Sequence, residues 1–440
     1  MSCVEAKDIP QSLLPPAQSS KVAVDAIGTL SAYSFITKHK TDQLLDLYQL
    51  VHLATRNWLQ TEGSLRRWTA KALNRLEEMF PDSDHRNRSV WRIYLPHARY
   101  TLETHLDIDV VFNKTALLWK FGKCAHRDGR YKEAEKAFAQ VMQTRKRKLG
   151  AEHLSTLRSM RYLASTYRNQ GQWKEAEELA VQVIETRKRV LSPEHLSTLA
   201  SIANLASTYR NQGRWKEAEE LEVQVMGTRK RVLGPEHPST LASIANLAST
   251  YTNQGRWKEA EKLAVQVMET TKRVLGPEHP STLTNIANLA STYTNQGRWK
   301  EAEELAVQVM ETTKRVFGLE HPSTLTSIAN LASTYRNQGR WKEAEELAVQ
   351  VMETRKRVLG PEHPDTLTSM NNLALTLKSR SRDEEAILLM KTCFQLQKQI
   401  LGTHYPCTET SLEALNEWQM ENIEITWCTG FCTGTRFYTI

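Results

Sequence analysis

Histidine recurs along this chain at a fixed interval, and it is the first residue type to test for chemistry. Six histidines lie 42 residues apart in an E-H-P or E-H-L turn: His153, His195, His237, His279, His321 and His363. A metal ion needs ligands a few ångströms apart, whereas one position in neighbouring packed helical copies recurs at roughly one helix diameter, about 10 Å. We therefore interpret these histidines as loop-packing or capping residues, and we expect neither a metal site nor a cofactor.

Cys124 and His126 are the other pair whose types could do chemistry, as a thiol nucleophile and its base. Two residues apart on a helix, they point to different sides. The sequence has no paired carboxylates and neither an H-E-x-x-H nor a G-x-S-x-G motif. It therefore predicts a protein that is not an enzyme.

The element that must position any site here is a repeat. Tryptophans mark its period of 42 residues, with Tyr131 one period before the first of them and Asp383 one period after the last: Trp173, Trp215, Trp257, Trp299 and Trp341. A fixed period in this range indicates a repeat architecture rather than a single globular core.

One copy, residues 246–287 with the turn before it, can be interpreted physically. Apolar residues at helical spacing from Leu241 to Tyr251 predict a first helix, helix A, with Pro238 in its first turn and Ser239 and Thr240 as capping hydroxyls. Gly255 ends it. A second helix, helix B, follows with a broad apolar stripe that includes Trp257, and ends at Gly276. Each copy is then a helical hairpin that buries its faces only by stacking on its neighbours.

These residues resemble a known family. L-A-x-x-Y in helix A followed by G-x-W/Y-x-E-A is similar to the tetratricopeptide repeat, and the 42-residue period with the closing G-P-E-H-P resembles the form found in kinesin light chains. The resemblance covers seven copies, residues 113–407, and the outer copies depart from it, as caps do. It implies an all-α fold, a right-handed α-solenoid of helical hairpins.

Charge and cysteine usage limit the possible partners. The formal net charge is +8 and the pI is about 9.0, but within a copy acids open helix B and bases close it, as the helix macrodipole favours. We therefore expect no nucleic acid partner. The scattered cysteines indicate a reducing compartment, and without a signal peptide or a long apolar run we expect a cytoplasmic protein that does not bind membranes. The cysteines are Cys3, Cys124, Cys393, Cys407, Cys428 and Cys432.

The residues before the repeats carry a second resemblance. Helical patterns cover residues 22–80, and the strings A-I-G-T-L-S-A-Y-S-F-I, L-V-H-L-A-T-R-N-W-L and Y-L-P-H-A-R-Y resemble the winged-helix segment that joins an NB-ARC ATPase to its repeats in filamentous-fungal NOD-like receptors. Where that family has a nucleotide-contacting histidine, this chain has Tyr48, and it contains no G-x-x-x-x-G-K-[ST] phosphate loop. The resemblance implies the C-terminal half of such a receptor.

The expected organisation has four parts. Residues 1–21 are a flexible segment, and residues 22–112 are a small helical, winged-helix-like block with a degenerate half repeat. Residues 113–407 are seven repeats, and residues 408–440 are a capping helix and a poorly ordered tail from Trp427 onward.

A polar position recurs inside helix A, before Leu-Ala: Asn204, Asn246, Asn288, Asn330 and Asn372. In kinesin light chains and related proteins, helix A lines a concave groove, and matching asparagines hold the backbone of an extended peptide. An amide side chain suits that role because it offers donors and an acceptor to a peptide bond. The alternative is that these asparagines cap turns or bond within their own repeat.

One position varies among near-identical copies; it lies six residues after each of the first four of these asparagines, and in the copy before them it is residue 168. It is arginine in the outer copies and threonine in the middle ones: Arg168, Arg210, Thr252, Thr294 and Arg336. If this position faces the groove, a less charged patch lies between basic ones and suits a partner with acidic ends. Neutral drift among duplicated copies is an equal alternative.

Taken together, the sequence favours a non-enzymatic scaffold that holds a protein or peptide in the groove of its repeats. An alternative is the ligand-sensing half of a NOD-like receptor that acts with a nucleotide-binding partner or by self-association. A kinesin-light-chain-type cargo adaptor is a further alternative, although the N-terminal block lacks sustained heptads.

Overall fold

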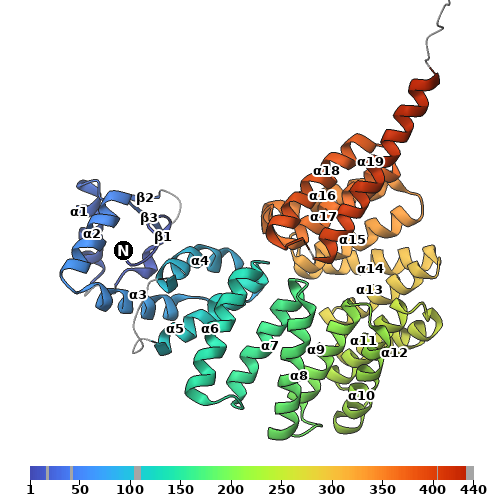
Figure 1. Ribbon diagram of the computed structural model, residues 1–440, viewed down its shortest axis with the longest axis horizontal. Helices are drawn as coiled ribbons and strands as arrows, with labels where there is room; N and C mark the ends of the chain where they lie inside the picture. Colours follow the sequence, from blue (N-terminus) through green and yellow to red (C-terminus); the bar gives the residue numbers. More distant parts are fainter. Residues whose placement is uncertain (16–18, 40–42, 104–110, 404, 433–440) are drawn as a thin grey trace, which may run out of the picture. The chain divides into compact units, whose positions relative to one another are not determined.

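The computed structural model describes residues 1–15, 19–39, 43–103, 111–403 and 405–432. These residues form two compact units, 1–166 and 167–440, and the division falls inside helix α7. The boundary expected between residues 112 and 113 lies inside the first unit. Nineteen α-helices are described, and almost all of them pack against the next along the chain (Figure 1). Among these helices, none combines the length and the apolar character needed to cross a membrane.

The first unit begins with a small antiparallel sheet in the order β1-β3-β2. Strand β3 is central, so that Ile9 of β1 pairs with Leu45 and Ile36 of β2 pairs with Leu47. The strands and 3-10 turns are β1 (Ile9–Pro10), η1 (Gln11–Leu13), β2 (Ile36–Lys38), β3 (Leu44–Leu47) and η2 (His85–Asn87). The helices of this block are α1 (Ser20–Ala32), α2 (Gln49–Thr61), α3 (Leu65–Met79) and α4 (Arg88–Glu103).

Two expectations for this block need correction. The helical pattern expected across residues 22–80 is interrupted by β2 and β3, because burial in β3 alternates with a period of two, as in a strand with one covered face. The start of the segment expected to be flexible is packed, since Cys3 and Val4 are 5% exposed and Ile9 is 1% exposed, while residues 16–18 lie outside the described residues. Burial of these side chains ties the start of the chain to the sheet and to α3 and α4.

Seven helical hairpins follow. The first helices of the copies (helix A) are α5 (Val111–Arg127), α7 (Leu154–Asn169), α9 (Leu196–Asn211), α11 (Pro238–Asn253), α13 (Pro280–Asn295), α15 (Pro322–Asn337) and α17 (Pro364–Ser379). The second helices (helix B) are α6 (Tyr131–Leu149), α8 (Trp173–Val190), α10 (Trp215–Leu233), α12 (Trp257–Leu275), α14 (Trp299–Phe317), α16 (Trp341–Leu359) and α18 (Asp383–Ile400). Helix α19 (Pro406–Cys432) packs on α18. The second unit is therefore an all-α solenoid.

The helix ends follow the local sequence, with one change. The histidine of each E-H-P/L turn is the residue before helix A, and its ring Nδ1 accepts a hydrogen bond from the backbone N–H two residues on, 3.1 Å from Ser239 in the fourth copy. The capping role predicted for histidine is confirmed, and the prediction that Ser239 and Thr240 supply capping hydroxyls is wrong. Gly255 and Gly276 end helices A and B with positive φ of 74° and 92°.

The core lies between the helices and is made of small and branched side chains. In the fourth copy helix A buries Leu241, Ile244 and Leu247, and helix B buries Ala264 and Val267. The tryptophans that mark the period are not part of this core, since four of them are between 38% and 44% exposed: Trp215, Trp257, Trp299 and Trp341. Each is the first residue of helix B, beside the turn, and this position explains why the expected burial is wrong.

The capping helix expected near the end of the chain is present as α19, and it extends into the segment from Trp427 where little order was expected. Leu415 and Trp418 of α19 are buried against α17 and α18 and close the solenoid. Residues 427–432 continue the helix. The rest of the predicted tail, residues 433–440, lies outside the described residues.

Candidate functional site

The five asparagines of helix A occupy equivalent places on α9, α11, α13, α15 and α17. Asn288 and Asn330 are exposed, and the other three are half-buried. In the part of the chain that the structure describes, none of the five side-chain amides has a hydrogen bond. The backbone carbonyls of four of these residues accept bonds from threonines four residues on, and that of Asn246 accepts one from Arg210. These amides neither cap a turn nor bond within their repeat, so their donors and acceptors are available.

A cavity of about 210 Å³ lies between α13, α14 and α15. Asn288 and Thr294 line it from one helix A, and Asn330 lines it from the next. Helix α14, which follows α13 in the same hairpin, forms the floor of the cavity through Ala306 and Val309. Small side chains on helix B thus leave space between successive first helices, and the predicted polar residues surround that space.

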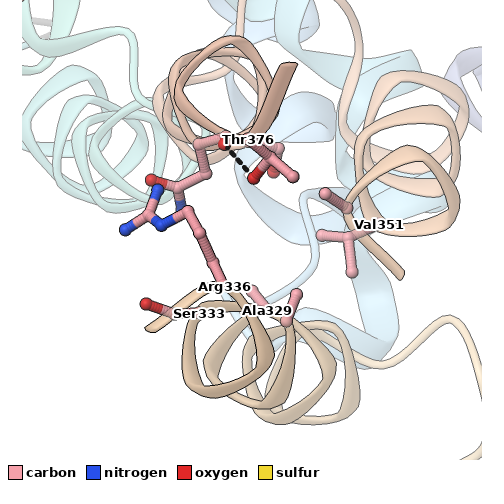
Figure 2. Close-up of a pocket in the computed structure, with 9 residues that line it drawn as sticks. Ala329, Ser333, Arg336, Val351 and Thr376 are labelled. Carbon is pink, nitrogen blue, oxygen red and sulfur yellow. Dashed lines mark hydrogen bonds between the residues drawn. The ribbon is translucent and has the colours of Figure 1, made fainter. Parts of the chain in front are cut away.

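A second cavity repeats this arrangement one copy later, with a volume of about 20 Å³. Ala329, Ser333 and Arg336 of α15 line one wall, and Asn372 and Thr376 of α17 line the other. Figure 2 shows the Arg336 side chain extending from α15 across the opening towards the helix that carries Thr376, with Val351 on the third helix. The structure therefore places Asn288, Thr294 and Asn330 around one cavity and Arg336 and Asn372 around the next, and Ser333 lines both.

The variable position has different surroundings in different copies. Thr252 donates its hydroxyl to the carbonyl of Ala248, and Thr294 does the same with Ala290, both at 3.0 Å. Arg210 instead reaches the carboxylate of Glu222, with Nη1 3.3 Å from Oε1, and the carbonyl of Asn246 at 3.2 Å. Arg168 lies at the division between the two units.

Glu222 is a partner of the predicted site residue Arg210 that the sequence analysis missed. It stands on helix B at the place of Ala264, Ala306 and Ala348 in the following copies, and its side chain is 3% exposed. Thr250 of the next helix A donates a hydrogen bond to Oε2 at 2.6 Å. Burial raises the pKa of Glu222, against the lowering effects of Thr250 and Arg210. The signal was available, because a glutamate replaces the alanine of these near-identical copies.

A set of polar contacts around one arginine recurs beside the turn between helix A and helix B, and it links neighbouring copies. We call this set the arginine bracket. In the fourth copy the Arg256 guanidinium lies 4.0 Å from the centre of the Tyr251 ring and 2.8 Å from Glu219 of the preceding helix B. It also contacts Glu259 at 2.7 Å, and Gln254 donates to the same Glu219 at 2.9 Å. This bracket recurs at Arg214, Arg298 and Arg340. It accounts structurally for the R-W-K-E-A string.

The other candidate pairs have structural explanations. Cys124 is fully buried, and burial raises the pKa of its thiol to about 12, which is unfavourable for a nucleophile. His126 stacks edge-on against Tyr131. Four cysteines are free thiols, Cys3, Cys124, Cys393 and Cys407, and the side chains of Cys428 and Cys432 lie outside the described part.

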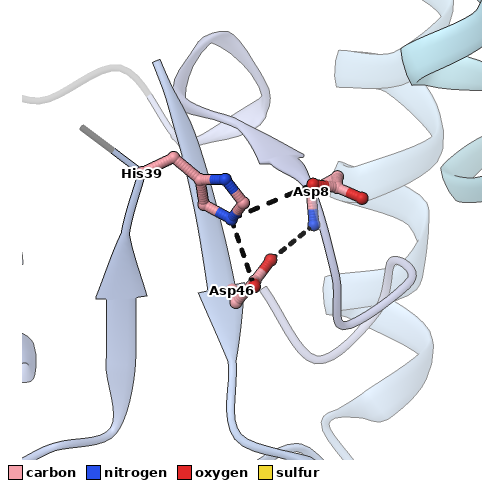
Figure 3. Close-up of side chains that lie close together, drawn as sticks. All are labelled: Asp8, His39 and Asp46. Atoms are coloured by element: carbon pink, nitrogen blue, oxygen red, sulfur yellow. Dashed lines mark hydrogen bonds and ion pairs between the residues drawn. The ribbon is translucent and has the colours of Figure 1, made fainter. Parts of the chain in front are cut away.

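A cluster in the first unit was not anticipated. Asp8, His39 and Asp46 each place one potential ligand atom within 4.8 Å of the others (Figure 3). His39 Nε2 lies 3.1 Å from Asp46, and the Asp8 N–H donates to Asp46 at 2.7 Å. Although partial burial opposes it, these two contacts lower the pKa of Asp46. The three residues form a polar network that links β3 to the residues beside β1 and β2.

Family comparison agrees with this geometry. Sequence profiles described as tetratricopeptide repeat match residues 114–189, 198–239, 240–315, 324–365 and 366–405. The chain belongs to the tetratricopeptide-repeat (TPR) family. Its TPR hairpins form a repeat-based interaction fold, and proteins of this family generally bind protein or peptide partners.

Individual relatives share parts of the chain. A nucleotide-binding leucine-rich repeat (NLR)-like protein from Hyaloscypha variabilis is 43% identical over 162 residues, which are 36% of this chain and 16% of that protein. This TPR chain thus matches only a small part of that relative's length.

Solved structures with similar folds include TPR-like repeats of a Podosopora anserina protein described as a kinesin light chain. They are 40% identical with a TM-score of 0.40, and the match covers 46% of this chain and 95% of that one. A Rap protein complexed with the competence and sporulation factor is 11% identical with a TM-score of 0.49, covering 82% of this chain and 99% of that one.

Proposed function

We propose that this TPR chain is a non-enzymatic scaffold that holds an extended peptide segment of a partner protein in the groove formed by its first helices. The observation that supports the proposal is the row of unbonded amides beside the two cavities. Asn288 and Asn330 face one cavity, and Asn372 faces the next. Successive copies of one amide match the repeating donors and acceptors of a peptide backbone.

The energetics favour a ligand that engages several copies at once. One hydrogen bond between an amide and a backbone contributes only about 0.5 to 1.5 kcal/mol. Affinity must therefore come from repetition, and a peptide has to lie along the groove to use more than one asparagine. Apolar floor residues such as Val309 and Val351 add contact area below the peptide side chains.

The test begins with a peptide library because the natural partner is unidentified. Random 12-residue peptides displayed on phage are selected on the whole chain, and the selected peptides are titrated by calorimetry. In the double variant Asn288→Ala with Asn330→Ala, we expect the dissociation constant to rise at least about fivefold, since two hydrogen bonds are lost. The thermal midpoint should stay nearly unchanged, because these amides make no bonds inside the fold.

The chain offers a matched control. Asn295 and Asn337 end the same two helices, are exposed, and lie outside both cavities. Changing this pair to alanine should leave peptide affinity unaltered. Equal losses from both pairs, or a large drop in the thermal midpoint for the first pair, would show that the asparagines do not form the peptide site.

A second candidate function rests on the match to the NLR-like protein. In this alternative the chain is the ligand-sensing part of a NOD-like receptor and acts with a nucleotide-binding partner. Titration of the chain with ATP separates the two candidates. Measurable affinity for ATP would favour the receptor function, and no heat of binding together with selected peptides would favour the scaffold.

A further inference from the structure

Away from the boundary between the two units, three positively charged residues occupy the variable position of the groove in the second unit. They are Arg210 on α9, Arg336 on α15 and Lys378 on α17. Two of them have acidic partners inside the chain. Arg210 pairs with Glu222 at 3.3 Å, and Lys378 pairs with Asp383 at 3.1 Å and with Glu421 at 2.8 Å. Their charges are therefore neutralised before any ligand arrives.

Arg336 differs from both. In the described part of the chain its guanidinium has neither a hydrogen bond nor an ion pair, although the side chain is half-buried. Burial lowers the pKa of Arg336, with no acidic group acting against that effect. A partly desolvated cation without a partner is unfavourable, and a carboxylate placed against it would recover hydrogen bonds as well as charge.

The copy that contains Glu222 shows where such a carboxylate would lie. The equivalent positions three copies later are 126 residues further along the chain. Arg336 there corresponds to Arg210, Thr376 corresponds to Thr250, and Ala348 corresponds to Glu222. The 20 Å³ cavity lies at this place and is lined by all three residues. It is large enough for about one water molecule, so a carboxylate entering from the groove would replace solvent rather than packed side chains.

The threonine supports the same comparison. Where Glu222 is present, Thr250 donates its hydroxyl to that carboxylate. Where alanine stands instead, Thr376 donates to the carbonyl of Asn372 at 2.9 Å. The threonine at this position therefore donates to a carboxylate where one is present and to the backbone where it is absent. Thr376 is therefore a second potential donor for a carboxylate beside Arg336.

We propose that Arg336, Thr376 and the space above Ala348 form a subsite for the side-chain carboxylate of a glutamate or aspartate in the bound peptide. The proposal rests on the peptide groove proposed above and names its chemical preference. Because Arg210 and Lys378 are neutralised internally, the groove selects one acidic residue at the sixth copy. This differs from the partner with acidic residues at both ends that the sequence suggested.

The experiment uses the peptides selected on the whole chain and their Glu→Gln or Asp→Asn analogues. We expect one acidic position to be enriched, and replacing it by the amide should weaken binding about tenfold. With Arg336→Thr, the residue found at Thr294, the acid and its amide should bind equally. With Ala348→Glu, which reproduces the Glu222 arrangement, the acidic preference should also disappear, because the new carboxylate occupies the subsite.

Glu222→Ala provides the opposite change. It should free Arg210 and create a second acidic preference three copies earlier. Circular dichroism and thermal midpoints check that each variant is folded, and Arg336→Thr keeps the proposal testable if Ala348→Glu does not fold. Peptides that need the asparagines but bind equally as acid and amide would overturn this subsite and leave the proposed scaffold standing. If the library yields no peptide, both fall.

Discussion

The pair Arg210 and Glu222 allows a double-mutant cycle in which each substitution introduces the residue of a neighbouring copy. Arg210→Thr copies Thr252, Glu222→Ala copies Ala264, and the double variant makes both groove positions of the third copy the same as those of the fourth. Each single substitution removes one partner of the ion pair and leaves the other. The double variant restores an arrangement that the chain already uses.

The expected magnitudes follow from burial and charge. With an effective dielectric constant near 20, charges 3.3 Å apart attract by about 5 kcal/mol before desolvation is subtracted. Without Arg210, Glu222 can avoid being a buried anion by binding a proton. At pH 7 that costs at most about 3 kcal/mol from an ordinary pKa of 4.5, and less from a raised one. We therefore expect Arg210→Thr to destabilise the chain by about 2 to 3 kcal/mol at pH 7.

The other two variants should be mild. Glu222→Ala leaves Arg210 bonded to the carbonyl of Asn246, so we expect a change within about 1 kcal/mol. The double variant should lie equally close to the parent chain, because replacing a buried ion pair by uncharged residues is often neutral. The two substitutions are then strongly coupled, and their effects do not add.

The pH dependence supplies an independent check. A carboxyl group whose pKa is raised on folding stabilises the fold below its unfolded pKa and loses that contribution as the pH rises through the folded value. The penalty for Arg210→Thr should therefore be small near pH 4.5 and grow towards pH 7. Urea unfolding followed by circular dichroism, with hydrogen exchange of α10 and α11, measures this locally. A harmless, pH-independent Arg210→Thr would refute the pairing.

Three further predictions concern stability and reactivity. Leu289→Ala should cost about 2 to 5 kcal/mol, because its side chain is 2% exposed, and Trp299→Ala should cost less since that side chain is 38% exposed; thermal unfolding in the reverse order would contradict the assigned core. Arg298→Ala should lower the thermal midpoint slightly, and less so at 1 M salt, since its ion pairs are solvated; a salt-independent loss measured by thermal denaturation would argue against them. Cys124 and Cys393, whose buried thiols have a pKa raised to about 12, should be alkylated at pH 8 about a thousandfold more slowly than in denaturant; equal rates by mass spectrometry would contradict their burial.

The helical hairpins could be predicted from the sequence because their causes are local. Glycines that end helices and apolar residues at helical spacing recur every 42 residues, and repetition removes the ambiguity of any one copy. The capping histidine was predicted as one of two roles. The hydroxyl caps were wrong because the ring Nδ1 of His237 reaches the N–H of Ser239 first.

The features that could not be predicted depend on contacts between copies. Tryptophan suggests burial by its type, but Trp257 is the first residue of helix B, beside a turn, and its side chain is 43% exposed. The sequence does not distinguish Arg210 from Arg336, because both are arginines at the same position of the repeat. Only the packing of three helices shows that a carboxylate reaches one and not the other. Similarly, the strand Leu44–Leu47 is too short for its alternating pattern to outweigh the helical propensity around it.

Another position of the repeat, at which the polar residue also changes from copy to copy, indicates that the lack of a bonding partner at Arg336 is unusual. At this position, on helix B, Arg229 donates to the hydroxyl of Ser243 on the next helix A at 2.8 Å. One copy later the arginine becomes Thr271 and the serine becomes Asn285, whose amide donates to the Thr271 hydroxyl at 3.4 Å. In the copy after that, the hydroxyls of Thr313 and Ser327 lie 2.8 Å apart. In the next copy, Arg355 again faces a serine, with Nη1 2.9 Å from Ser369.

At this position of helix B, the side chain therefore has a polar partner on the next helix A, whether it is a charged arginine or an uncharged threonine. The groove follows the same rule at Arg210, which acquires Glu222, and at Lys378, which acquires Glu421. If drift alone set the groove residues, Arg336 would be expected to have acquired a partner within the chain or to have become threonine, as in the copies before it. A partner supplied by a bound peptide explains why it has done neither.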